Sequence, residues 1–516
     1  MRRARALLAL FGLVTALVPA CNGGFPSIGQ GRTISITILK GDVGSKNSPL
    51  PIATDIANPA TFTVRLEALK PDGTVDTSFN GHVNLTAEPG TVVDLTVRNV
   101  QLHAGVLDNV VVPITGAFGD AHLQATDLGY EPAAPDRKPP PECSDGIDNN
   151  GNGLIDYPAD PGCYAPVDDT EALGTYAEGV SQPLHFALPR IPLVRGYDPG
   201  NNGNGNATAF PHQQIAIDTG WRGSLSYDFS TVVIGLTAAG FYVQDLQNAS
   251  TDQPTGYTGL YAYNFSTPTN MDVCDRVQLL SGTASDFYGF TELNYPTWQI
   301  EFWNPAVRPC MVPEPTVLGP PDLANNNRLW QEEATLVRVQ TSGTISAHVA
   351  QHFGPGMIPK VNGTYTPDNT HSSCDFNRNG KVDFTDAAEN DCSKVCVGTC
   401  ANAPTDFECS EWSQFQSQNN FDLVVVDSST GAKARVQANA AAAASFNPVE
   451  QRDATGNPLP VRSFTGLLAY FSGGCQFTMN ARCDDDVIAD PHGTPLPSNV
   501  ACVHPRTLSQ INANTH

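Results

Sequence analysis

Basic residues are scarce in this 516-residue chain. It carries 28 Lys and Arg against 52 Asp and Glu, which gives a formal net charge of −24. Such a balance repels polyanions and argues against nucleic acid as a partner. After residue 21 the chain also lacks an apolar run long enough to span a bilayer, so we expect any membrane contact to be made through a lipid.

Catalytic signatures are equally scarce. We find no nucleophile elbow, P-loop or dinucleotide fingerprint in the sequence. His348 and His352 are four residues apart, but no Glu lies between them and their segment alternates like a strand. We therefore expect a protein that is not an enzyme.

The N-terminus has the pattern of an export signal. Three Arg residues lie within the first five positions, and an apolar stretch follows over residues 6–18. Val18-Pro-Ala-Cys21 resembles a bacterial lipobox, which implies that residues 1–21 form a lipoprotein signal peptide and that Cys21 carries the lipid. The alternative is an ordinary signal peptide cut near Ala20. Asn22 after the cysteine favours the outer membrane or cell surface.

The cysteines support export. The chain has 13, and setting Cys21 aside leaves 12, an even number that suits full pairing in an oxidising compartment. Cys143 and Cys163 bracket one compact motif, so we predict a disulfide between them. The other pairings cannot be deduced from the sequence.

Residues 31–135 alternate apolar and polar side chains in short runs such as Thr33–Ile38, Phe62–Ala68 and His82–Ala87. Alternation with turns about every ten residues predicts a β-sandwich. The 45 Gly and 41 Pro of the chain supply many turns and indicate a mainly β protein. The segment resembles bacterial immunoglobulin-like modules, which implies a spacer or adhesive role.

The segment between Cys143 and Cys163 is rich in Asp, Asn and Gly. Oxygen side chains recur at positions one, three, five and nine of a loop that starts at Asp148, with Gly at position six. The segment resembles a short calcium motif of exported myxobacterial proteins, which implies bound Ca²⁺. The alternative is a disulfide-closed turn without metal. The implied ligands are Asp148, Asn150, Asn152, the carbonyl of Leu154, Asp156 and, one place late, Asp160.

Two later stretches share one strand pattern. The runs Gly240–Asp245, Gly259–Tyr263 and Phe287–Leu293 resemble the strands of OB-fold modules found beside secreted bacterial nucleases. A second, interrupted copy ends in Arg482 and Asp486, which match the family's "Pro-Arg-x-x-x-Asp" ending. The resemblance implies OB-like β-barrels over 220–305 and 330–490, following the immunoglobulin-like β-sandwich.

OB folds bind single strands through aromatic side chains on a basic groove. Between residues 220 and 303 we count eight acidic and only two basic residues. We therefore expect the aromatic side chains here to fill the barrel and its wall rather than to bind nucleic acid.

A Cys-rich insertion over 368–412 interrupts the second copy. It holds a 12-residue loop, Asp375–Asp386, with Gly380 at the position of the sharp turn. The loop resembles one dockerin or EF-hand repeat, which implies a second calcium site. A dockerin needs two such loops, so cohesin binding is not expected, and a loop without metal is the alternative. The implied ligands are Asp375, Asn377, Asn379, the carbonyl of Lys381, Asp383 and Asp386.

Together these patterns predict a non-enzymatic, calcium-stabilised, lipid-anchored protein of the cell envelope that binds a protein or a glycan. The alternative hypothesis is an accessory OB-fold protein for extracellular nucleic acid, related to secreted nucleases but without their catalytic domain.

Overall fold

The protein is mainly β, as the sequence predicts, with 42% of the described residues in strands and 8% in helices. Its chain divides into two units, Met1–His185 and Phe186–His516, in the computed structural model. The signal peptide with Cys21, and the insertion 368–412 with its calcium-type loop, lie outside the described residues. The structure describes residues 31–133, 138–196, 208–221, 231–246, 256–349, 357–361, 364–367, 419–443, 445–446, 448, 459–471, 476–489, 493–506 and 510.

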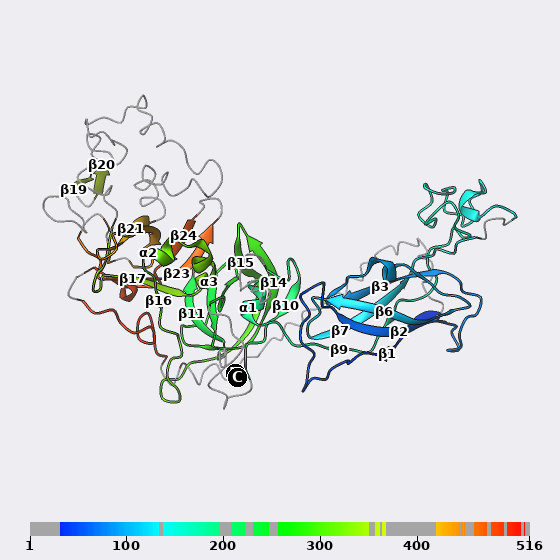
Figure 1. Ribbon diagram of the computed structural model, residues 1–516, viewed down its shortest axis with the longest axis horizontal. Coiled ribbons are helices and arrows are strands. Elements are labelled where there is room, and N and C mark those ends of the chain that lie inside the picture. The colour runs from blue at the N-terminus through cyan, green and yellow to red at the C-terminus, as the bar shows by residue number, and fades with distance from the viewer. Residues whose placement is uncertain are drawn as a thin grey trace, which may run out of the picture. The chain divides into compact units, whose positions relative to one another are not determined.

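The first unit contains two antiparallel sheets, drawn in blue and cyan in Figure 1. Strands of the two sheets contact each other, β1 with β7 and β3 with β4. One sheet has the order β1 (Thr33–Lys40), β2 (Ala60–Leu69), β6 (Val106–Thr115), β4 (Thr91–Val92). The other has the order β5 (Val100–Gln101), β3 (His82–Glu88), β7 (Asp120–Asp127), β8 (Gly179–Val180), and β9 (Leu184–His185) also pairs with β7.

Alternation in the sequence becomes alternation in burial. Along β2 the side chains of Phe62, Val64 and Leu66 are buried, and the residues between them are not. Strands β3 and β7 show the same period of two. One face of each of these strands therefore lies in the core, which is the outcome that the alternation predicts.

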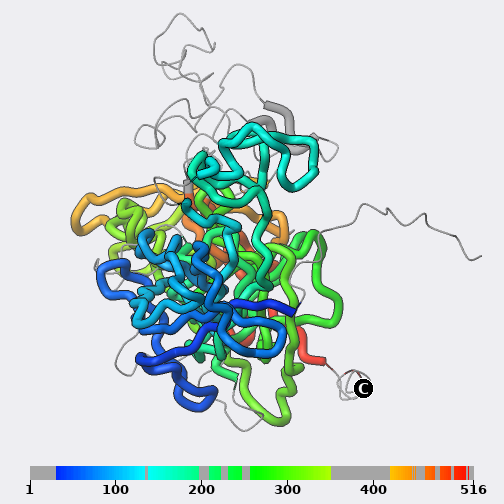
Figure 2. The backbone as a smooth tube through the Cα atoms, turned by 90° about the vertical axis from the view of Figure 1, so that its right-hand side faces the viewer, coloured from blue at the N-terminus to red at the C-terminus, as the bar shows by residue number. Residues whose placement is uncertain are grey.

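A strandless segment connects β7 to β8 in the second sheet. Residues 138–178 form turns and one short 3-10 helix, Glu142–Ser144, and appear as cyan and teal loops in Figures 1 and 2. Asp168 ties this segment back to the sheets, because its Oδ1 accepts the N–H of Glu131 at 2.9 Å. Burial raises the pKa of the Asp168 carboxyl.

The second unit begins with α1 (Ile191–Val194) and a closed set of five strands. The strands follow the order β14-β11-β12-β13-β15, and β15 pairs back with β14. Strands β13 and β15 run parallel, and the other pairs are antiparallel. The strands are β11 (Thr231–Thr237), β12 (Gly240–Asp245), β13 (Gly259–Tyr263), β14 (Arg276–Phe287) and β15 (Phe290–Glu301), and β10 (Gln214–Ala216) adds to the edge of β14.

The same connection pattern recurs further along the chain. Strand β17 pairs with β23, β18 pairs with β21, and β22 runs parallel to β24. The long segment between β18 and β21 contains the hairpin of β19 (Met357–Val361) and β20 (Thr364–Pro367). This set comprises β16 (Thr316–Val317), α2 (Pro320–Leu323), α3 (Asn326–Glu332), β17 (Leu336–Gln340), β18 (Ile345–Val349), β21 (Asn420–Asp427), β22 (Lys433–Asn439), β23 (Ser463–Phe471), β24 (Gln476–Asn480) and β25 (Val487–Ile488).

The two strand sets share buried side chains. Ile234 and Tyr261 of the first set lie in one apolar cluster with Leu467 of the second. Arg482 forms a buried ion pair with Asp486 at 2.8 Å and also donates to the carbonyl oxygen of Ile234 at 3.1 Å. The Arg-x-x-x-Asp ending that the sequence singles out therefore joins one set to the other.

A second buried ion pair lies beside this cluster. Arg195 Nη2 is 2.6 Å from Glu333 Oε2, and both side chains are buried. Arg195 also donates to the carbonyl oxygens of Gly259 and Trp330. Burial is the main cause that raises the pKa of Glu333 to about 7, and the charge of Arg195 opposes the shift.

Cys274 has an unusual backbone conformation and forms a disulfide. Its φ is +78°, a left-handed conformation that favours Gly, and its sulfur is bonded to Cys310. The described residues contain a further disulfide between Cys483 and Cys502. No helix in the described part of the chain is long and apolar enough to cross a membrane.

Candidate metal centre

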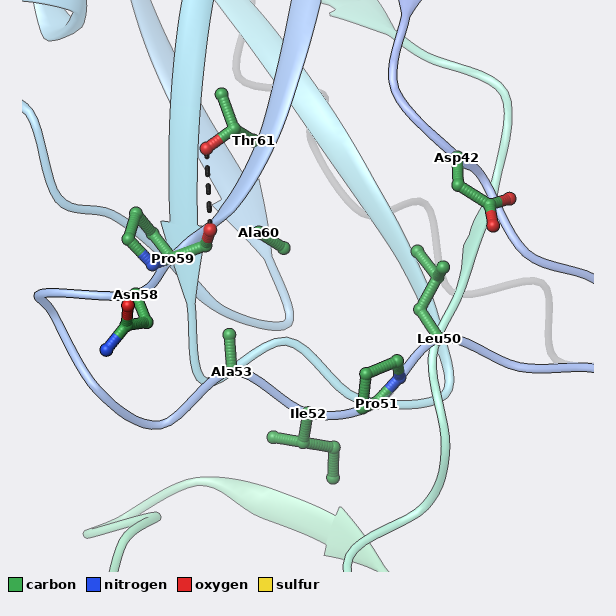
Figure 3. Close-up of a pocket in the computed structure, with 9 residues that line it drawn as sticks. All are labelled: Asp42, Leu50, Pro51, Ile52, Ala53, Asn58, Pro59, Ala60 and Thr61. Carbon is green, nitrogen blue, oxygen red and sulfur yellow. Dashed lines mark hydrogen bonds between the residues drawn. The ribbon is translucent and has the colours of Figure 1, made fainter. Parts of the chain in front are cut away.

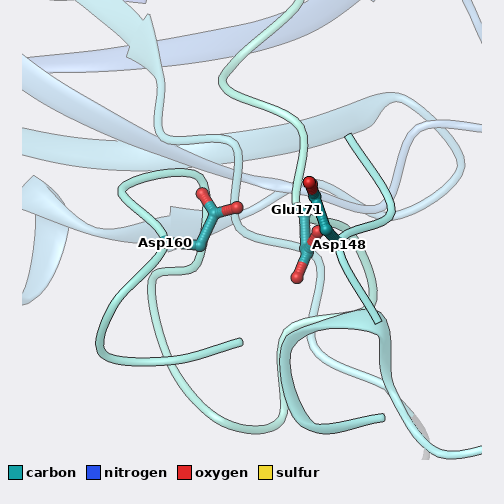
Figure 4. Close-up of side chains that lie close together, drawn as sticks. All are labelled: Asp148, Asp160 and Glu171. Carbon is teal, nitrogen blue, oxygen red and sulfur yellow. The ribbon is translucent and has the colours of Figure 1, made fainter. Parts of the chain in front are cut away.

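Three carboxylates converge in the strandless segment of the first unit. One oxygen each from Asp148, Asp160 and Glu171 lies within 4.8 Å of the other two. Figure 4 shows that the three side chains come from separate turns of this segment. Asp160 and Glu171 are buried. Among the described residues this is the one group of three or more His, Cys, Asp or Glu side chains with metal-ligand proximity.

The Asp148 carboxylate stabilises the loop by accepting hydrogen bonds from three of its backbone N–H groups. Its carboxylate accepts backbone N–H groups from Gly151 at 2.7 Å, Asn152 at 3.1 Å and Gly153 at 2.9 Å. Asn150 and Asn152 each accept the N–H two residues ahead, the turn for which Asn is suited. Gly153 has φ +87°, so the residue at loop position six needs a left-handed conformation, as the motif predicts.

Asp160 is held at the centre by the disulfide-closed turn. The predicted disulfide between Cys143 and Cys163 is present. Asp160 accepts the N–H of Gly162 at 2.6 Å, and its carbonyl oxygen accepts the N–H of Cys163 at 3.1 Å. The residue that the sequence places one position late thus reaches the other carboxylates because the chain turns sharply before Cys163.

Glu171 is the participant that sequence reasoning missed. Its carboxylate accepts the N–H groups of Asn149 at 2.6 Å and Asp156 at 3.1 Å. Its own N–H is bonded to Glu142 Oε2 at 3.1 Å. It lies beyond the second cysteine, outside any 12-residue spacing. The acidic stretch 168–171 directly after the motif is the signal that could have pointed to it.

Asp156 lies outside the three-carboxylate group, and the carbonyl oxygen of Leu154 stays a predicted ligand. The carboxylate of Asp156 accepts the N–H of Gly146 at 2.9 Å and is not part of the three-carboxylate group. Leu154 donates its N–H to Asn152, and its side chain is exposed. The amide nitrogens of Asn150 and Asn152 point to Asp160, at 2.9 Å and 3.1 Å from its Oδ2.

The donor set suits a hard cation. Ca²⁺ binds oxygen at 2.3–2.6 Å, so oxygens on opposite sides of the ion are about 4.6–5.2 Å apart. The three carboxylate oxygens all lie within 4.8 Å of one another, which is compatible with this size. Asp148, Asp160 and Glu171 would supply three negative charges, and further oxygens would come from the Asn side chains and the backbone.

A hollow of about 430 Å³ lies elsewhere in the first unit, beside the start of β2. Figure 3 shows its wall, which is built mostly from aliphatic and proline side chains such as Leu50, Pro51 and Ile52. Asp42 is the one titratable residue on this wall, and its Oδ1 accepts the N–H of Gly44. The hollow thus offers no pair of groups for acid–base or nucleophilic chemistry.

Comparison with known proteins finds no family model, no curated protein and no solved structure that matches this chain.

Proposed function

We propose that this chain is a non-enzymatic, calcium-stabilised, lipid-anchored protein of the cell envelope that binds a protein or glycan component of its surroundings. The observation that carries the proposal is the convergence of Asp148, Asp160 and Glu171 inside a disulfide-closed segment. All three groups are carboxylates, their spread fits Ca²⁺, and a disulfide suits an exported protein.

A calcium ion bound by these three carboxylates would have a structural role, because it would link two parts of the strandless segment. Glu171 belongs to the stretch that leads from the motif to β8, and Asp148 belongs to the loop itself. An ion shared by the two segments would hold the motif against the chain that returns to the second sheet. Extracellular calcium modules bind with Kd values of about 10⁻⁴–10⁻³ M, which suits permanent loading outside the cell.

The strand connections support the finer fold assignments. Two contacting antiparallel sheets in the first unit are typical of an immunoglobulin-like spacer. In the second unit, both strand sets combine antiparallel pairs with one parallel pair, β13 with β15 and β22 with β24. The closed set of β11 to β15, and the matching parallel pair in the later set, support two OB-like barrels, here used as binding modules.

The charge favours a partner other than nucleic acid. Residues 220–303 hold eight acidic and two basic residues, so a phosphate chain would release few counterions on binding. The alternative hypothesis, an accessory protein for extracellular nucleic acid, requires that the protein bind single-stranded DNA at physiological salt.

The direct test is binding of labelled residues 22–516 to isolated cell envelopes in calcium and in excess EGTA. We expect saturable binding that calcium supports, that nuclease treatment leaves intact and that DNA does not compete away. Absence of binding in calcium would refute the proposal, and loss of binding after nuclease treatment would assign the protein to the nucleic-acid alternative.

A further inference from the structure

A series of neighbouring aromatic rings runs from the apolar cluster between the two strand sets of the second unit to the surface of that unit. Ring centroids are 4.6 Å apart for Tyr242 and Tyr261, 6.4 Å for Tyr261 and Tyr263, and 4.6 Å for Tyr263 and Phe265. Phe265 is then 5.4 Å from Tyr295. Tyr242 and Tyr261 are buried, whereas Phe265 is 60% and Tyr295 is 71% exposed.

The two exposed rings are held in place by an unusual backbone. Strands β13 and β15 run parallel with Tyr263 opposite Asn294, so Phe265 and Tyr295 both follow the end of this pairing. Phe265 has φ +60° and Tyr295 has φ +52°. The left-handed conformation is unfavourable for a residue with a Cβ, and it is rare for bulky residues. Two such residues that display their rings side by side point to a function for the rings.

The two chain segments that carry these rings are polar but uncharged. Residues 263–270 and 293–300 contain no Asp, Glu, Lys, Arg or His and are rich in Ser, Thr, Asn and Gln. Beyond Tyr295, the exposed residues of β15 alternate as Thr297 and Gln299. Rings flanked by hydroxyl and amide groups form a surface for a neutral, hydroxyl-rich ligand, whereas the acidic remainder of the strand set repels polyanions.

We propose that Tyr263, Phe265 and Tyr295, here called the aromatic platform, bind a neutral polysaccharide. The C–H groups on the face of a pyranose ring are weakly positive and pack on the negative face of an aromatic ring, while hydroxyl and amide side chains bond the sugar hydroxyls. Successive rings in one line suit a chain of sugars. This inference rests on the proposed function and narrows its ligand from a protein or glycan to a neutral glycan.

Affinity electrophoresis of residues 22–516 tests the platform. Native gels would contain hydroxyethyl cellulose, xylan, dextran or galactomannan, with alginate and single-stranded DNA as charged comparisons. We expect retardation in at least one neutral gel and none in the charged gels. The double variant Phe265→Gly/Tyr295→Gly should lose about tenfold in affinity or more per ring, the scale on which removal of a stacking partner acts.

The variants separate binding from folding. Gly adopts the left-handed conformation readily, so the double variant should melt at the wild-type temperature. Phe287→Ala is the matched control, because Phe287 is 55% exposed at the tip of the β14–β15 hairpin. Phe287 pairs with Phe290 across the hairpin, and Tyr295 lies five residues further along β15, which corresponds to roughly 17 Å of strand. The Phe287→Ala variant should therefore bind as the wild type does.

Three results would overturn the inference. They are no retardation in any neutral gel, equal retardation of the wild type and the double variant, and retardation by DNA at physiological salt. Envelope binding by the double variant distinguishes the two proposals. If the variant and the wild type both bind envelopes equally in calcium, the platform is wrong and the proposed function stands. If neither binds, the proposed function itself fails.

Discussion

Replacing Glu171 by Gln should lower stability more in calcium than in its absence. In the presence of the ion the variant loses a charged ligand and should be less stable than the wild type. In EGTA the loss should be smaller, because the substitution relieves repulsion with Asp148 and Asp160, although one of the two oxygens that accept the N–H groups of Asn149 and Asp156 is replaced by an amide nitrogen.

The size of the effect follows from linkage. An ion that binds only the folded state adds RT ln(1 + [Ca²⁺]/Kd), which is about 1.4–2.7 kcal/mol at 10 mM calcium for Kd values of about 10⁻³–10⁻⁴ M. For a unit of this size, such a change corresponds to a shift in melting temperature of roughly 3–11 °C. The wild type should show this shift between EGTA and calcium, and the Glu171→Gln variant should lose most of it.

Differential scanning calorimetry of residues 22–516 in 10 mM calcium and in excess EGTA is the assay. Glu178→Gln is the matched control, since Glu178 is an exposed acid on the same returning stretch and accepts only the Thr126 hydroxyl in the described contacts. A disulfide-closed turn without metal predicts a different result. The Glu171→Gln variant would then be destabilised equally in both conditions, and that outcome would refute the metal centre.

Three further substitutions test other parts of the account. The Asn152 amide donates to both oxygens of Asp160, and Asn152→Asp replaces it by a fourth carboxylate. The stability of the variant in EGTA should fall, while its calcium affinity, measured by calorimetric titration, should rise about tenfold. An unchanged calcium affinity would contradict this prediction. In the wild type the folded-state pKa of Glu333, about 7, lies above its ordinary value of 4.5, so the folded state holds the proton and stability falls as pH rises through 7. Arg195→Met should raise that pKa further, so urea unfolding should show a deficit that is constant below about pH 7 and grows above it by up to about 1.4 kcal/mol per pH unit, and a deficit independent of pH up to pH 8 would refute this role. Arg482→Ala should cost about 3–5 kcal/mol in the same assay because it leaves Asp486 buried and unpaired, and a loss below about 1 kcal/mol would contradict the joining role of this pair.

Local patterns allowed the sequence to predict much of the architecture. The alternation around Phe62, Val64 and Leu66 depends only on neighbouring residues, and it correctly indicates a sheet with one buried face. The same holds for Gly153, whose left-handed conformation the loop spacing requires. The pairing of Cys143 with Cys163 follows from the compactness of one motif.

Features that depend on the folded chain were not predictable. Glu171 reaches Asp148 because Glu142 bonds its N–H and the chain turns back after Cys163, and no fixed spacing encodes this return. Asp156 has the expected loop position, yet Gly146 competes for its carboxylate. Bulky residues such as Phe265 and Tyr295 disfavour the left-handed conformation, so nothing in the sequence indicated that they adopt it.

The most direct test of the metal centre is the number of calcium ions that the protein binds. Isothermal titration of residues 22–516 with calcium should give two sites for the wild type, one in each calcium-type loop, at Kd values of about 10⁻⁴–10⁻³ M. The Asp148→Asn/Glu171→Gln double variant should bind one ion fewer. Equal stoichiometry and affinity in the two proteins would contradict the account.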